Sequence, residues 1–186
     1  VVIVVAPWFA GLYIEMNSSE VLTLTLYKFL TNPFYINSIL SLNLLFNVLV
    51  GAVCLFASDR VWTRLGRRTP FLLVGWLLMA LALAFVPAAS SLAVLLPFVV
   101  LWLACQDISI TYEPLQQEIV PQQQRGRAGG FFTIVVQAVV IYTFVIVLGR
   151  FNELERFHGV SVSGEHWAYW CAGLLVIAST LFVTGL

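Results

Sequence analysis

Between two long apolar runs the chain reads Ser58-Asp59-Arg60-Val61-Trp62-Thr63-Arg64-Leu65-Gly66-Arg67-Arg68-Thr69-Pro70-Phe71. This segment, named here the basic loop, contains four of the nine lysine and arginine residues of the chain. Short loops rich in arginine stay on the cytoplasmic side of a membrane, because moving their charges across the bilayer is unfavourable. The basic loop therefore predicts which side of the membrane is the cytoplasm.

Outside the basic loop the chain is strongly apolar. Of its 186 residues, 61% are hydrophobic and only 10% are charged, which is too few to cover the surface of a soluble domain. The composition predicts an integral membrane protein, in a plasma membrane or a bacterial inner membrane, with the lipid bilayer as its surroundings. Nothing in it supports a nucleic-acid partner. Three cysteines lie inside apolar runs, where a thiol behaves as a small hydrophobic group, so no disulfide framework is expected.

A transmembrane helix needs ~20 predominantly apolar residues to cross about 30 Å of hydrocarbon. By this measure we expect an all-α fold with six transmembrane helices in one domain, residues 1–186, at approximately 3–30, 34–57, 71–86, 92–112, 130–148 and 166–186. The chain begins without a methionine and ends inside an apolar run, so we expect it to be the N-terminal part of a longer protein.

The first predicted span has a polar centre and allows two interpretations. It is either one long helix, or a short span that ends near Met16 and continues as an interfacial segment. The first interpretation is favoured because residues 21–30 are too apolar for an exposed loop, and Thr31-Asn32-Pro33 is the better turn signal.

The distribution of basic residues predicts the orientation of the spans. If the chain starts inside, both arginine-rich loops, 58–70 and 113–128, are cytoplasmic and hold six basic residues, whereas three lie outside. The external loop 149–165 then carries acidic and basic residues together, including Glu165, and we expect it to be solvated.

The basic loop also carries a family resemblance. An Asp-Arg pair followed by Gly-Arg-Arg-x-Pro-Phe resembles the loop between the second and third helices of major facilitator superfamily transporters. Within that superfamily it is most similar to the glycoside-pentoside-hexuronide cation symporters and the sucrose transporters. The resemblance implies that the six helices are half of a twelve-helix fold built from inverted three-helix repeats, whose C-terminal half is a further partner.

The same resemblance implies a function. We expect a secondary transporter of a small polar solute, a sugar or glycoside, coupled to a proton or sodium ion by alternating access and without a cofactor. The alternatives are a proton-driven efflux transporter of the same superfamily and a sensor that binds solute without moving it. No catalytic motif is visible, so an enzyme is not expected. The two histidines, His158 and His166, are not expected to form a metal site.

Two groups of residues are candidates for function. The resemblance implies that a charge network holds the cytoplasmic ends of the helices together, and we expect it to include Asp59, Arg60, Arg64, Gly66, Arg67, Arg68, Glu118 and Arg125. The alternative is that these charges only orient the protein, since solvated ion pairs contribute roughly 0 to 1 kcal/mol each.

The second group lies within the predicted spans, where ionisable side chains are unfavourable and usually face a cavity. We expect a polar chamber between spans one, two, four and five, formed by Glu15, Ser19, Glu20, Asn43, Asn47, Gln106, Asp107 and Gln137. On an ideal helix Glu15, Ser18, Ser19 and Leu22 share one face. The alternatives are that these groups are hydrogen-bond partners between helices, and that Glu20 lies outside the bilayer if span one is short.

Overall fold

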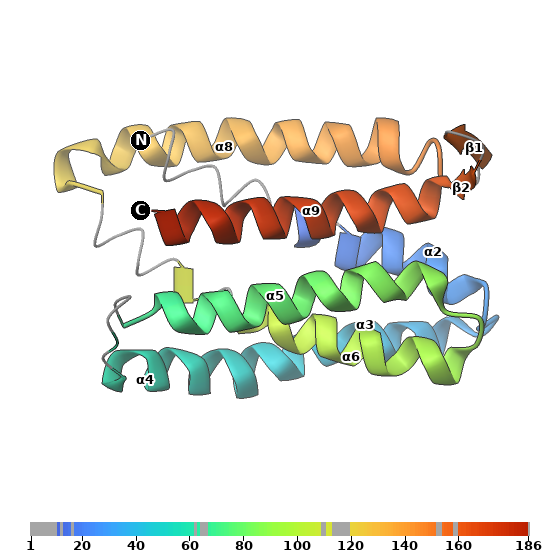
Figure 1. Cartoon of the computed structure of the whole chain (residues 1–186), viewed down its shortest axis with the longest axis horizontal. Helices are drawn as coiled ribbons and strands as arrows, with labels where there is room; N and C mark the ends of the chain where they lie inside the picture. Colours follow the sequence, from blue (N-terminus) through green and yellow to red (C-terminus); the bar gives the residue numbers. More distant parts are fainter. Residues whose placement is uncertain are drawn as a thin grey trace.

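The computed structural model describes residues 11, 13–15, 17–61, 63, 67–108, 111–112, 120–151, 154–157 and 160–185. Within these residues the chain is a bundle of long helices that run along one common direction (Figure 1). In that view α5 (Thr69–Phe85) and α9 (Gly164–Gly185) lie in the middle. Beyond α9 lies α8 (Arg125–Tyr142), and beyond α5 lie α4 (Ala52–Arg60) and α6 (Leu92–Ile108).

The first described helix continues through the polar centre of predicted span one. Its polar residues form a π-helix, η1 (Asn17–Val21), which leads directly into α2 (Leu22–Tyr27). Asn32 then has an extended backbone, and its side chain accepts a hydrogen bond from the Phe34 amide at 2.9 Å. This N-cap, with proline in the first helical turn, starts the next helix where the turn signal predicted it. The helical polar centre favours the single-helix interpretation, although residues 1–10 lie outside the described part.

The second predicted span is one helix of three parts. It consists of α3 (Pro33–Phe46), the π-helix η2 (Asn47–Gly51) and α4, which ends at Arg60. After the basic loop, α5 begins at Thr69, two residues before the predicted span, with Pro70 in its first turn. A π-turn inside an α-helix often marks a functional site, and here it begins at Asn47.

Three helical segments of the described residues are long and apolar enough to cross a membrane: Pro33–Arg60, Thr69–Ala88 and Gln122–Val145. The last includes the 3₁₀-helix η5 (Gln122–Gln124), α8 and part of the π-helix η6 (Thr143–Val147). With 17 residues, α6 is also apolar but shorter; at 1.5 Å per residue it covers only about 25 Å. A membrane location is consistent with these helices, and the number of six spans stays a prediction.

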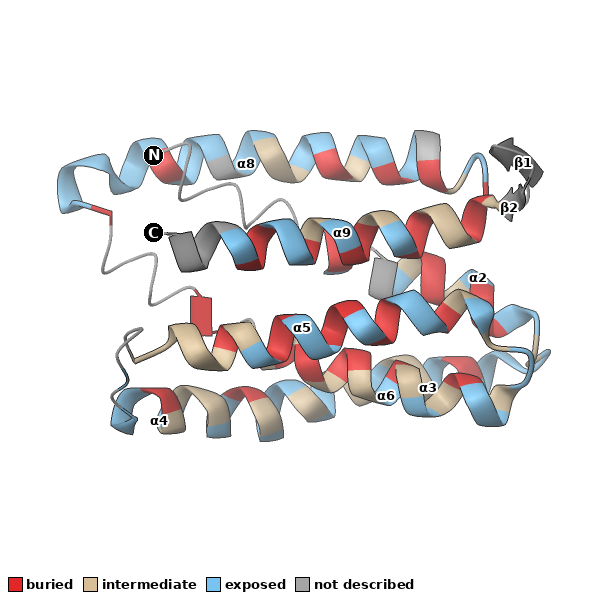
Figure 2. Cartoon of the chain, in the orientation of Figure 1, coloured by how far each residue is buried: buried red, intermediate tan, exposed pale blue. Residues whose placement is uncertain are grey.

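The core lies where α5 packs against α6 and α9. Its residues recur at helical spacing on one face of α5, including Leu72, Trp76, Met79 and Leu83 (Figure 2). Small residues bring the helices close together, since a Cβ added to Gly75 would lie 2.9 Å from the Ile108 side chain. Close approach at small residues is a typical way in which membrane helices associate.

A β-hairpin precedes α9, where we expected only a solvated loop. Strands β1 (Leu154–Phe157) and β2 (Val160–Ser163) pair antiparallel, with Leu154 opposite Ser163. Valine alternates with serine along β2, and alternating β-branched residues favour an extended strand. The expected all-α class therefore holds for the described residues apart from this hairpin and the short non-helical connections. The following helix begins at Gly164, two residues before the predicted start.

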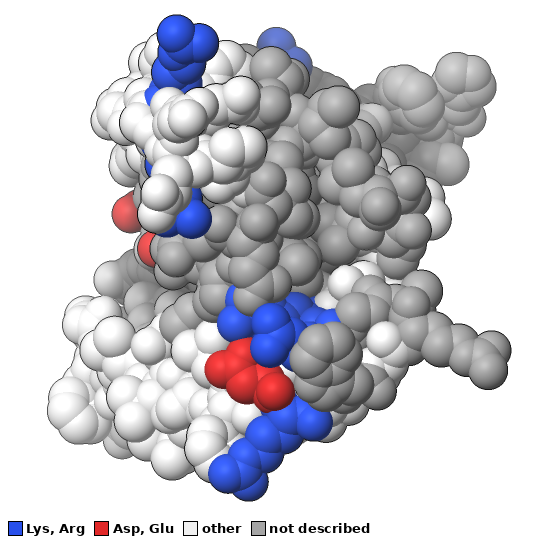
Figure 3. Space-filling view, turned by 90° about the vertical axis from the view of Figure 1, so that its left-hand side faces the viewer, with Lys and Arg blue, Asp and Glu red and all other residues white. Residues whose placement is uncertain are grey.

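The charged residues are unevenly placed along the bundle. The end of α4, the start of α5 and the start of α8 lie together at one end, whereas α2 and the hairpin lie at the other (Figure 1). Viewed from the first end, basic and acidic side chains form a group over the ends of the helices (Figure 3). The described arginines of both predicted cytoplasmic loops thus lie at the same end of the molecule.

Candidate functional site

The centre of the candidate site is a hydrogen bond between the second and fourth predicted spans. Asn47, the first residue of η2, donates from Nδ2 to Oδ1 of Asp107 at a distance of 3.1 Å. Asp107 lies in the last turn of α6 and is only 6% exposed. Both residues were predicted to line one polar chamber, and the structure brings them together.

Several polar atoms around this pair have no partner. In the described part of the chain, the buried oxygens Asn43 Oδ1, Gln106 Oε1 and Asp107 Oδ2 accept no hydrogen bond. Asn43 lies one helical turn before Asn47, and Gln106 directly precedes Asp107. Burying such groups without a partner is unfavourable by about 1 to 3 kcal/mol each. Asp107 and the nearby residues Asn43 and Gln106 therefore offer oxygen acceptors that a ligand with donor groups, or a cation, would satisfy.

The charge of Asp107 is not balanced by the protein. Among the described residues no lysine or arginine forms an ion pair with it, and its single hydrogen bond comes from a neutral amide. A charged carboxylate in an apolar interior without a partner is strongly unfavourable. Asp107 is thus suited to take up a proton or a metal cation, which is the chemistry that ion coupling needs.

The other predicted chamber residues are not part of this pair. Glu15 and Ser19 are exposed on the first helix, where the Ser19 hydroxyl donates to the backbone carbonyl of Glu15 at 3.3 Å. Glu20 is half-buried on the same helix. Gln137 is exposed on α8, which lies on the far side of α9 from α6 (Figure 1). The hydrogen bond between Asn47 and Asp107 joins two of the four helices, and the four-helix chamber stays a prediction.

The expected shared face of Glu15, Ser19 and Leu22 is also wrong. Leu22 is 0% exposed, whereas Glu15 and Ser19 face outward. The π-turn between Asn17 and Val21 is the physical reason, because its wider turn rotates each residue less than an α-helix does. The face that follows the turn is consequently shifted relative to the face that precedes it.

A second polar contact joins the ends of α4 and α5 at the basic loop. Arg68 Nη2 donates to Asp59 Oδ1 at 2.9 Å; the Arg68 side chain is 10% exposed and that of Asp59 is 57% exposed. The guanidinium of Arg60 stacks over the Phe56 ring, with its Cζ 3.9 Å from the ring centroid. The Asp59–Arg68 ion pair thus joins the end of α4 to the start of α5.

The remaining members of the expected charge network are in varied positions. Arg67 is half-buried, and Arg125 is exposed at the start of α8, where its Nε donates to the Val120 carbonyl at 3.4 Å. Arg64, Gly66 and Glu118 lie outside the described residues. The expected link between the basic loop and Glu118 therefore stays a prediction.

An ion pair at the opposite end of the bundle was not predicted. Glu165 is 4% exposed and pairs with Lys28, whose side chain is 46% exposed, although Glu165 was assigned to a solvated external loop. The available signal was its place directly before the aromatic run of Trp167, Tyr169 and Trp170, which marks a helix start rather than an open loop. The described residues contain no group of three His, Cys, Asp or Glu side chains that could hold a metal ion.

Comparisons with protein-family models, with curated proteins and with solved structures found no match for this chain.

Proposed function

We propose that the chain forms the N-terminal half of a secondary transporter of the major facilitator superfamily, which moves a small polar solute together with a cation. The observation that carries this proposal is the Asn47–Asp107 pair between two apolar helices, in which the carboxylate is buried and has no cationic partner among the described residues. Ionisable groups inside membrane helices usually belong to ion or substrate pathways. The motif in the basic loop supports the choice of superfamily.

The chemistry of the site supports a hydroxylated solute. The unpartnered atoms of Asn43, Gln106 and Asp107 are all acceptors, and the hydroxyl groups of a sugar or glycoside are donors that would satisfy them. The coupling cation, a proton or sodium, would neutralise Asp107 and so remove the unfavourable buried charge. If the solute satisfies the acceptor atoms and the cation neutralises Asp107, each would favour binding of the other, and the two would be carried together.

The proposed orientation places the end of the bundle with the basic loop in the cytoplasm. There the Asp59–Arg68 pair would hold α4 and α5 together while the cytoplasmic side is closed. Cysteines introduced singly at Arg67 and Arg125, in a background without the three native cysteines, should react with an impermeant maleimide applied from the cytoplasm. Reaction of either cysteine only from outside would contradict the orientation.

The function is tested by removing the titratable proton while keeping size and hydrogen bonding. Asp107→Asn and Glu15→Gln are compared with the parent in vesicles, using labelled sugars and glycosides under an imposed pH or sodium gradient. If these acids couple the ion, the variants lose accumulation against a gradient but keep solute binding and downhill exchange. Asn37→Gln, an exposed amide on α3, is the control and should accumulate solute as the parent does.

Other outcomes decide between the alternatives. If Asp107→Asn and Glu15→Gln both accumulate solute with unchanged dependence on pH and sodium, neither acid couples an ion. A parent protein that binds the sugar but never moves it is a sensor. Outward movement of solute driven by an inward proton gradient would instead identify an efflux transporter.

A further inference from the structure

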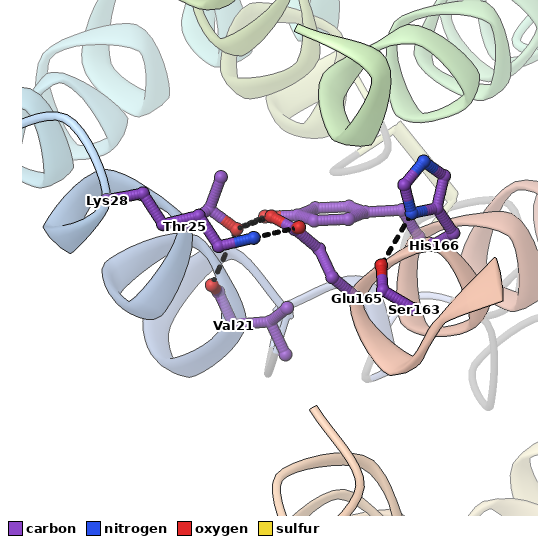
Figure 4. Close-up of polar contacts among 7 residues, drawn as sticks. Val21, Thr25, Lys28, Ser163, Glu165 and His166 are labelled. Carbon is purple, nitrogen blue, oxygen red and sulfur yellow. Dashed lines mark hydrogen bonds and ion pairs between the residues drawn. The ribbon is translucent and has the colours of Figure 1, made fainter. Parts of the chain in front are cut away.

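The first turn of α9 forms a polar cluster with the first helix, which we name the Glu165 cluster: Thr25, Lys28, Glu165 and Tyr169, of which all but Lys28 are buried (Figure 4). Lys28 forms an ion pair with Oε2 of Glu165, and the Thr25 hydroxyl lies 2.9 Å from Oε1 of the same carboxylate. The Tyr169 hydroxyl lies 2.9 Å from Thr25 Oγ1. Both oxygens of Glu165 thus contact the first helix.

The Thr25 hydroxyl carries a single proton and has two acceptors, Glu165 Oε1 at 2.9 Å and the Val21 carbonyl at 3.2 Å. When it donates to the nearer Glu165, it must accept from Tyr169. The donors then run from Tyr169 through Thr25 to the carboxylate, and Lys28 supplies the opposite charge. Glu165 also lies in the first turn of α9, where a negative charge interacts favourably with the helix dipole. The cluster is therefore neutral overall and satisfied on both carboxylate oxygens.

The first helix touches this turn on both sides of its polar centre. Before the polar centre, the Tyr13 hydroxyl donates to the Ala168 carbonyl at 3.4 Å. After it, Thr25 and Lys28 make the contacts with Glu165 and Tyr169. Tyr169 is itself fixed, because it is 0% exposed and its ring meets Trp102 of α6 edge to face at 5.8 Å. Two attachment points thus hold the π-turn Asn17–Val21 between them.

We propose that Glu165 is a positioning residue which, through Lys28 and Thr25, fixes the rotation of the first helix against α9. The π-turn determines which face of the following helical turns packs against α9. If the first helix could rotate about its axis, the side chains of Glu15 and Glu20 would change position relative to α9. The consequence for transport rests on the proposed function, in which Glu15 is a candidate coupling acid. Fixing of the helix itself does not depend on that function.

The test measures helix position directly in the full-length protein, in a background without Cys54, Cys105 and Cys171. Spin labels are attached to Leu24→Cys on α2 and Leu174→Cys on α9, both exposed, and their distance distribution is measured by pulsed electron paramagnetic resonance. The parent should give one narrow distance. Glu165→Gln and the milder Tyr169→Phe, which keeps the aromatic ring, should broaden or shift it.

Two further variants make the test specific. Ser163→Ala removes the contact of 2.7 Å between Ser163 Oγ and His166 Nδ1 at the same end of α9 without touching the first helix, so the narrow distance should persist. The exchange Lys28→Glu with Glu165→Lys restores an opposite pair and should recover the narrow distance. Unchanged distances in both Glu165→Gln and Tyr169→Phe would overturn the inference, and so would an exchange that stays as broad as Glu165→Gln.

Transport is measured separately on the same variants. Glu165→Gln should lower the maximal uptake rate by about ten- to a hundredfold, as expected when a reacting group moves by about 1 Å, and the charge exchange should recover it. Broadened distances with unchanged uptake would refute the link from this cluster to transport. A parent without uptake, but with the predicted distance changes, would count against the proposed function and leave the positioning of the helix supported.

Discussion

The hydrogen bond between Asn47 and Asp107 leads to an asymmetric prediction for stability. Replacing Asn47 by leucine leaves a buried carboxyl group without the one hydrogen-bond donor it has among the described residues, which should destabilise the fold by about 1 to 3 kcal/mol. Replacing Asp107 by leucine removes a buried, half-satisfied acid and leaves an amide that is itself exposed. Asp107→Leu should therefore be neutral or stabilising.

The size of the coupling between the two residues follows from the geometry. Their N···O distance of 3.1 Å is at the long end of the usual range and exceeds the roughly 2.7 to 2.9 Å that is typical of charge-assisted hydrogen bonds. Hydrogen bonds between membrane helices average ~0.6 kcal/mol and reach ~1.7 kcal/mol. We therefore expect a coupling of about 1 kcal/mol, or a factor of about five in the unfolding equilibrium.

The assay is a double-mutant cycle of Asn47→Leu and Asp107→Leu, measured by reversible unfolding of the full-length protein in mixed micelles. Asn37→Leu on the same helix is the control, and as an exposed position it should change the free energy of unfolding by no more than about 0.5 kcal/mol. A coupling below ~0.3 kcal/mol, the error of additivity, would refute the pair. So would an Asp107→Leu variant that is destabilised as much as Asn47→Leu.

Two other predictions concern packing and the basic loop. Gly75→Ala should lower the free energy of unfolding by about 1 to 3 kcal/mol, because the new Cβ would lie 2.9 Å from the Ile108 side chain. In the control Gly129→Ala the new Cβ meets no atom within 4 Å, so the thermal unfolding temperature should stay unchanged or rise. Equal unfolding temperatures for the two variants would contradict the close helix contact. Asp59→Asn should change the free energy of unfolding by less than about 1 kcal/mol, because the Asp59 side chain that pairs with Arg68 is 57% exposed. The same variant should take up solute more slowly with unchanged affinity. A loss of affinity at an unchanged uptake rate would argue against a gating role.

Helix positions could be predicted well because they depend on local properties. An apolar run bounded by Asn32-Pro33 or Thr69-Pro70 begins a helix wherever it is placed. The hairpin after Phe151 was missed, because its two strands are only four residues each and stand among charged residues that are typical of a loop. The alternation of valine and serine in β2 was the signal that was available.

The candidate site could be predicted only in part, because it depends on which helices meet. Asn47 and Asp107 were identified as polar groups in apolar surroundings, a property visible in the chain alone. That Gln137 lies on a helix beyond α9, and that Leu22 faces inward while Ser19 faces outward, follows from the packing order and from a π-turn. Neither the packing order of the helices nor the position of the π-turn can be predicted from the residue pattern.

The sequence by itself determined the apolar lengths, the helix starts and the concentration of arginine at one end of the bundle, because these follow from hydrophobicity, proline geometry and charge. Only the tertiary structure decided that Asp107 meets Asn47, that Arg68 meets Asp59 and that Glu165 is buried against Lys28. Such contacts join residues that are far apart in the chain or separated by a loop, and they form only where helix packing brings the two side chains within hydrogen-bond distance.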